Sequence, residues 1–175
     1  MCVVIEAVAH FVVCHGTADV SDKSIFHLDK LFFPHHVFNH DHWATVVVDM
    51  KERTVTYYCS MGRKGLYILK MVFRYLKQKH RDLFGVRLPN IAGWKLVECP
   101  IETPLQRNLD GVGLGVDCGV FMCMFIDRIM QNAPNLYCQE HMVSYRELIC
   151  TSILSNQIHI WDGDECDTYI IVKFS

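Results

Sequence analysis

Residues 116–121 read Val-Asp-Cys-Gly-Val-Phe and decide the fold. Cys118 stands here at the start of an apolar run that predicts a helix over residues 119–130. A helix N-terminus stabilises negative charge and so favours a thiolate, and the nearby glycines let a substrate approach the backbone. The pattern indicates a cysteine nucleophile. The alternative is a buried structural cysteine, which is what we expect of Cys123.

A second run, His42-Trp43, lies far upstream of this cysteine. A histidine that is distant in sequence can be the base for a thiol, because such partners meet in space. Residues 43–48 are mostly β-branched and predict a buried strand, and residues 54–58 predict a second one. The polar turn at residues 49–53 joins them into a hairpin.

The hairpin predicts which residue orients His42. With the turn centred between residues 50 and 51, paired residues have numbers that sum to about 101, so His42 faces Cys59. Opposed residues share a face, with Cβ atoms about 5 Å apart. Asp49 is seven residues along the same strand from His42, roughly 23 Å away, and is predicted to be a turn residue.

Composition sets the class of protein. The chain has 175 residues, half of them hydrophobic, which favours one domain, and its net charge of -2 predicts no attraction to nucleic acid or membrane. No apolar stretch approaches about 20 residues. The nine cysteines are odd in number and form no Cys-x-x-Cys pair, which favours a reducing intracellular compartment over a disulfide framework. We expect a monomer without a cofactor or a metal.

Other segments complete the expected secondary structure. Residues 1–14 favour an amphipathic or buried helix over a secretory signal. The remaining expected elements are helices over residues 66–84 and 139–155, a strand over 94–97, a loop over 101–117 and a possible strand over 169–172.

Four segments together resemble the SUMO-specific (sentrin-specific) cysteine proteases. They are residues 42–49, 54–62, 115–121 and 139–146, within a match that runs from about residue 25 to residue 158. The resemblance implies an α+β, papain-like cysteine protease fold. The chain would be the C-terminal part of the catalytic domain, with a strand hairpin and a central helix that carries the nucleophile. We therefore expect a divergent segment at 1–24, a catalytic region at 25–158 and a tail at 159–175.

The resemblance also implies an activity. It is cleavage after the Gly-Gly end of a SUMO-like modifier, as deSUMOylation or as precursor processing, in the nucleus, the cytoplasm or both. Cys118 would be the nucleophile and His42 the base, and Trp43 would help form the narrow tunnel that admits the two glycines. The implied partners are the modifier and its conjugates.

Three departures from the family weaken this expectation. Cys59 stands where the family has an aspartate, and a neutral thiol holds and charges an imidazole poorly. The family's oxyanion glutamine would fall at Val112, unless residues 109–114 are an insertion, in which case Gln106 is the displaced donor. The alternative is that Gln106 is a solvated loop residue. Third, only 41 residues precede His42, and the family's upstream tryptophan is not found among them.

Two rival functions remain open. One is a pseudoenzyme that binds a ubiquitin-like modifier without cleaving it, which the cysteine at position 59 favours and the retained Cys118 and His42 disfavour. The other is a zinc site made of His42, Cys59 and Cys118, because two thiolates and an imidazole suit zinc.

Overall fold

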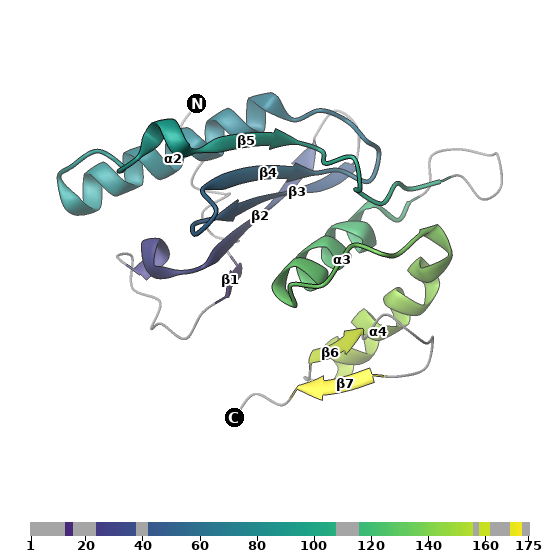
Figure 1. The fold of residues 1–175 in the computed structure, drawn as a ribbon. Helices are drawn as coiled ribbons and strands as arrows, with labels where there is room; N and C mark the ends of the chain where they lie inside the picture. Colours follow the sequence, from purple (N-terminus) through teal and green to yellow (C-terminus); the bar gives the residue numbers. More distant parts are fainter. Residues whose placement is uncertain are drawn as a thin grey trace.

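The computed structural model describes residues 13–15, 24–37, 42–107, 116–155, 158–161 and 169–172. A five-stranded sheet has the order β1-β2-β3-β4-β5, antiparallel except for the parallel pair β4-β5, and β6 and β7 form a separate antiparallel pair (Figure 1). The elements in chain order are β1 Val13–His15, β2 Lys30–Val37, β3 His42–Asp49, β4 Thr54–Tyr58, α2 Leu66–Phe84, β5 Lys95–Glu98, α3 Cys118–Met130, α4 Met142–Ser155, β6 Ile158–Trp161 and β7 Tyr169–Val172. Short 3₁₀ turns lie at Ser24–His27, Ile91–Gly93 and Gln139–His141.

Helix α2 covers one face of the sheet (Figure 1). Its apolar residues recur at helical spacing, so they form one buried stripe. The stripe consists of Ile68, Leu69, Val72 and Leu76, which pack in one cluster with Val46, Val48 and Val55 of the sheet. The helix ends at Gly85, whose φ of 71° is in the left-handed region and whose N–H donates to the Arg81 carbonyl at 2.8 Å.

Helices α3 and α4 form a second core on the other face. Successive strand residues point to opposite faces, so Tyr57 belongs to the α2 cluster while the Tyr58 ring lies 5.4 Å from the Phe125 ring of α3. The sheet is therefore covered on both faces. This layering places the start of α3 at the end of the sheet where β3 begins.

Most expected elements are confirmed. The helix over residues 66–84 and the strand over 54–58 have the expected bounds, β3 is one residue longer at each end than expected, and α3 begins one residue earlier, at Cys118 itself. The expected helix over 139–155 is a 3₁₀ turn followed by α4, and the strand over 169–172 is confirmed as β7. None of the helices in the described ranges combines the length and apolarity that a bilayer span requires.

Three strands, β1, β2 and β6, were not expected. The β2 strand contains Pro34, which normally interrupts a ladder, and the Thr45 hydroxyl across from it donates to the Phe33 carbonyl at 3.4 Å. The β6 strand is held by its partner β7. The helix expected over residues 1–14 is wrong at its end, because Val13–His15 form β1, and residues 1–12 lie outside the described residues.

The hairpin register differs from expectation by two residues. Thr45 pairs with Tyr58 and Asp49 with Thr54, so the paired numbers sum to 103 rather than 101. The reason is a wider turn of residues 50–53, in which Arg53 has a φ of 53° and the Asp49 carboxylate accepts the Glu52 N–H at 2.8 Å. Asp49 is therefore the last residue of β3 and not a turn residue as expected, although its carboxylate bonds to the turn. A shift of two residues leaves every side chain on the expected face.

Candidate active site

The first residue of β3, His42, is buried against Cys59. Its Nε2 lies 3.2 Å from the Cys59 Sγ. Cys59 follows the last residue of β4, so the contact is made just beyond the paired part of the hairpin rather than between directly opposed residues. The expected proximity of these two side chains is confirmed, although the register that predicted it is wrong.

The surroundings of Cys59 have opposite effects on the pKa of its thiol. Burial raises the pKa of its thiol, which is therefore neutral at physiological pH. Backbone N–H groups of Arg63 and Met61 and the Tyr57 hydroxyl hydrogen-bond the sulfur and act to lower that pKa. Position 59 thus has three donors that would stabilise an anion, but carries a side chain that stays neutral.

Gly65 allows Tyr57 to reach Cys59. A β-carbon at Gly65 would lie 2.4 Å from the Tyr57 ring, so no larger residue fits without displacing it. Gly65→Ala is expected to lower the free energy of unfolding by about 1–3 kcal/mol, as overpacked cores do, in urea denaturation. Gly93→Ala is the control, because its added carbon would approach no atom closer than 3.8 Å. Equal losses in the two variants would show that the Tyr57 ring is not constrained by Gly65.

Cys118 is the first residue of α3 and is buried. A β-carbon added at the next residue, Gly119, would lie 3.7 Å from Cδ1 of Trp43, so the start of α3 lies against the start of β3. Trp43 is 41% exposed, and its ring lies 4.8 Å from the His36 ring. The start of α3, where Cys118 lies, is therefore near the start of β3, where His42 and Trp43 lie.

The side-chain carboxamide of Gln139, at the start of the 3₁₀ turn before α4, holds the segment that leads into Cys118. Gln139 donates from Nε2 to the Asp117 carboxylate at 2.6 Å and accepts the Arg107 N–H on Oε1 at 3.0 Å. Arg146 pairs with the same carboxylate and donates to the Val116 carbonyl at 3.2 Å. The sequence contains these residues within the segment that resembles the protease family, but spacing alone did not predict that they hold Asp117.

Removing the Gln139 carboxamide is expected to destabilise the protein. Gln139→Met keeps a similar volume but leaves the Arg107 N–H without its acceptor and removes a charge-assisted bond to Asp117. We expect the free energy of unfolding to fall by about 1–3 kcal/mol. Val143→Met places the same side chain at an exposed position of α4 and is expected to change stability by less than about 0.5 kcal/mol. Similar stabilities for the two variants in urea denaturation would contradict the role assigned to Gln139.

Gln106 is held beside the residue that follows Cys59. Its N–H donates to the Ser60 carbonyl at 2.7 Å, and the Ser60 hydroxyl donates to its Oε1 at 3.3 Å. Gln106 is half-buried and belongs to no helix or strand. A cavity of about 420 Å³ opens here, between residues 103–107 and 137–138. The proposed insertion at residues 109–114 lies outside the described residues.

The zinc alternative does not fit. Within the described ranges, no group of three or more His, Cys, Asp and Glu side chains is placed to hold a metal ion. His42, Cys59 and Cys118 are all described, so this finding overturns the zinc site proposed for them.

A thiol at the start of a helix and an imidazole at the start of a strand, at one end of a mixed sheet, are typical of the papain-like cysteine peptidase fold. The model of the Ulp1 protease family, C-terminal catalytic domain, matches residues 12–153. The chain belongs to this family, which confirms the resemblance to SUMO-specific proteases and the α+β fold.

Comparisons with individual proteins support the same family. Sentrin-specific protease 2 of Pongo abelii is 31% identical over 118 residues, which are 67% of this chain and 19% of that protein. The Chaetomium thermophilum Ulp1-like SUMO protease catalytic domain has a TM-score of 0.62 at 23% identity, covering 78% of this chain and 49% of that one. The C-terminal Ulp1 protease domain in complex with SMT3, the yeast ortholog of SUMO, gives 0.57 at 24% identity, covering 74% and 53%. The chain spans about a fifth of the length of the sentrin-specific protease 2 relatives.

Proposed function

We propose that this chain is a cysteine peptidase that cleaves after the Gly-Gly end of a SUMO-like modifier, with reduced activity. Cys118 is the nucleophile and His42 the base. Because Nε2 of His42 faces Cys59, proton exchange with the nucleophile uses Nδ1. Trp43 covers the two glycines, and Gln106 contributes to the oxyanion site. The relatives named for SUMO support the choice of modifier.

The contact that carries this proposal is the one between His42 Nε2 and Cys59 Sγ, at 3.2 Å. It fixes the imidazole in the orientation that a third catalytic residue normally provides. The contact also explains the reduced activity, because a neutral thiol cannot offset the charge of an imidazolium. Residues 25–158 form the proposed catalytic region, with 1–24 and 159–175 as flanking segments, in an intracellular, nuclear or cytoplasmic protein.

The second candidate is a pseudoenzyme that binds the modifier without cleaving it. The neutral thiol at position 59 favours it, since the triad lacks its anion. Both candidates need the surface around Trp43, and they differ only in whether Cys118 forms a covalent bond with the modifier.

A modifier probe with a C-terminal electrophile separates the two candidates. Incubation of the intact chain with a SUMO vinyl-sulfone probe, followed by mass spectrometry, is expected to give an adduct on Cys118, and Cys118→Ala should give none. Binding of intact SUMO without adduct formation would support the pseudoenzyme. An adduct on other cysteines, with Cys118 unlabelled, would overturn the assignment of the nucleophile.

A further inference from the structure

The net charge of -2 conceals a strong separation of charge along the chain. Residues 63–87 hold eight of the 17 Lys and Arg residues but only one of the 19 Asp and Glu residues, so this segment carries +7 and the rest of the chain -9. The segment consists of α2 and the residues just beside it. A local field of this size attracts anions even when the whole protein is slightly acidic.

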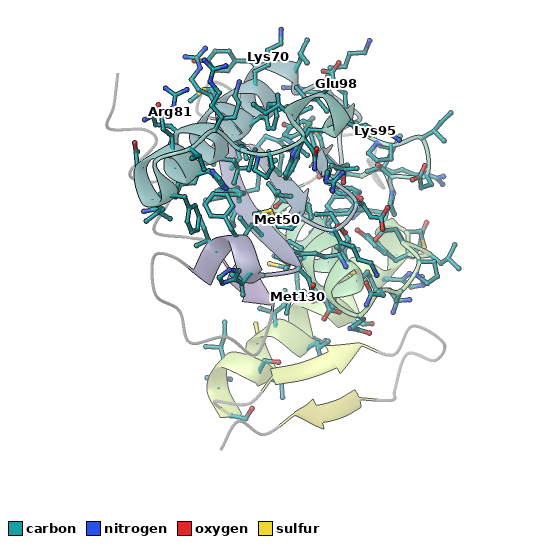
Figure 2. The ribbon with its side chains drawn as sticks, turned by 60° about the vertical axis from the view of Figure 1, so that its left-hand side comes forward. Met50, Lys70, Arg81, Lys95, Glu98 and Met130 are labelled. Carbon is teal, nitrogen blue, oxygen red and sulfur yellow. The ribbon has the colours of Figure 1, made fainter. Side chains whose placement is uncertain are left out.

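Four of the cations form one line, which we call the basic stripe: Lys70, Arg74, Lys77 and Arg81. Their spacing of i, i+4, i+7 and i+11 puts them on a single face of α2, away from the face that packs on the sheet. Lys70, Arg74 and Arg81 are exposed, and Lys77 lies over the Phe73 ring at 4.9 Å. Figure 2 shows Lys70 and Arg81 projecting from α2 at the outer edge of the molecule.

No acidic side chain in the described ranges forms an ion pair with the stripe. The described ion pairs lie elsewhere, at Lys30–Asp49 and Arg146–Asp117. Asp82, the acidic residue of α2, accepts a hydrogen bond from Gln78 at 2.7 Å. Like charges at i and i+4 destabilise a helix, so the stripe is a cost to α2 that an anionic partner would remove.

We propose that the basic stripe is a docking surface for an acidic polypeptide segment in extended conformation. The four cations span about 16.5 Å along the helix, in steps of about 6, 4.5 and 6 Å. An extended chain places every second side chain on one face, about 6.7 Å apart. A segment with Asp or Glu at alternate positions therefore presents carboxylates at nearly the spacing of the stripe, where the guanidinium groups can bind them bidentately.

Charge and length favour a polypeptide over nucleic acid. Nucleic-acid-binding domains are commonly basic overall, with an isoelectric point above about 9, whereas the isoelectric point here is 6.5. A polyanion that extends beyond the stripe meets a chain that otherwise carries -9. A short acidic segment ends before it reaches that surface.

The stripe is separate from the proposed active site. Helix α2 packs on one face of the sheet and α3, which begins at Cys118, packs on the other (Figure 1). A segment docked on α2 therefore does not cover the start of α3, and the proposal stands whether or not the chain cleaves a modifier.

Fluorescence anisotropy with two labelled peptides tests the proposal on the intact chain. The peptides Glu-Thr-Glu-Thr-Glu-Thr-Glu and Thr-Glu-Glu-Glu-Glu-Thr-Thr have the same composition but different carboxylate spacing. The stripe variant is Lys70→Gln, Arg74→Gln and Arg81→Gln. The control variant is Lys51→Gln, Arg53→Gln and Lys95→Gln, which removes three exposed charges at the hairpin turn and on β5. Lys77 is kept in both because it packs on Phe73.

We expect the alternating peptide to bind the native chain with an affinity that falls as salt is added. Its affinity for the stripe variant should be about tenfold lower. The control variant should lose less than about twofold, and the clustered peptide should bind the native chain several-fold more weakly. Circular dichroism checks that both variants are folded. No binding, equal losses in the two variants, or no preference between the peptides would overturn the proposal. So would tighter binding of a thymidine pentanucleotide, which carries four phosphates, or self-association that requires the stripe.

Discussion

Replacing Cys59 with aspartate is expected to raise the turnover of a SUMO-conjugate substrate by about 10²-fold. The carboxylate would accept the His42 Nε2–H, fix the tautomer and stabilise the imidazolium. The two backbone N–H groups and the Tyr57 hydroxyl that surround position 59 would hold it ionised despite its burial. Loss of this carboxylate in serine protease triads lowers turnover by roughly 10⁴, and the gain here is smaller because a thiol ionises more easily than a hydroxyl.

The controls for this prediction separate charge from shape. Cys59→Asn has nearly the shape of aspartate without its charge and is expected to gain much less. Cys59→Asp combined with Cys118→Ala should show no turnover. If Cys59→Asp folds and binds SUMO but turns over no faster, the carboxylate is not what limits the reaction. If it folds but no longer binds, the variant itself has damaged the site.

Removing the side chain of Gln106 is expected to lower turnover by about 10²–10³, measured in the more active Cys59→Asp background. This is the usual loss when one oxyanion donor is deleted in an acyl-transfer site. The Ser60 hydroxyl donates to Oε1 of Gln106 and so orients its carboxamide. Ser60→Ala should therefore lower turnover by a smaller factor, about tenfold or less, through positioning alone.

The kinetic pattern tests the assignment of Gln106. Gln106→Ala should lower kcat with little change in KM, because an oxyanion donor acts in the transition state. A rise in KM with an unchanged kcat would instead place Gln106 in modifier binding. A Leu105→Ala variant, at an exposed neighbouring position, should leave both constants nearly unchanged.

The sequence predicted the fold where local pattern and tertiary packing agree. The α2 helix has one apolar stripe between polar faces, and the strand over residues 54–58 is bounded by turns, so both were predicted with correct bounds. The β2 strand was not predicted because Pro34 and two histidines interrupt its apolar pattern, and its stability comes from pairing with β3. The hairpin register was wrong because the left-handed conformation of Arg53 widens the turn, which sequence alone does not reveal.

The candidate site residues could be predicted from the sequence where they lie in short segments with a clear secondary-structure pattern. Cys118, His42 and Cys59 were identified because helix start, strand start and hairpin pairing each restrict where a side chain can lie. Gln139 and its bonds to Asp117 and Arg107 join three segments that are far apart in sequence. Such a hydrogen bond depends on how helices pack, and no local pattern specifies it.

The carboxamide of Gln139 also has a consequence for how this site can evolve. It ties the backbone of Arg107 to the side chain of Asp117, so both ends of the intervening segment are anchored to the same residue. The length of that segment should therefore have little effect on the position of the thiol. Each doubling of the number of residues in an anchored loop adds only about 0.6 kcal/mol to the free-energy cost of closing it. Residues inserted between Arg107 and Asp117 should therefore leave the start of α3 in place, so this segment is a suitable position for grafting foreign sequence.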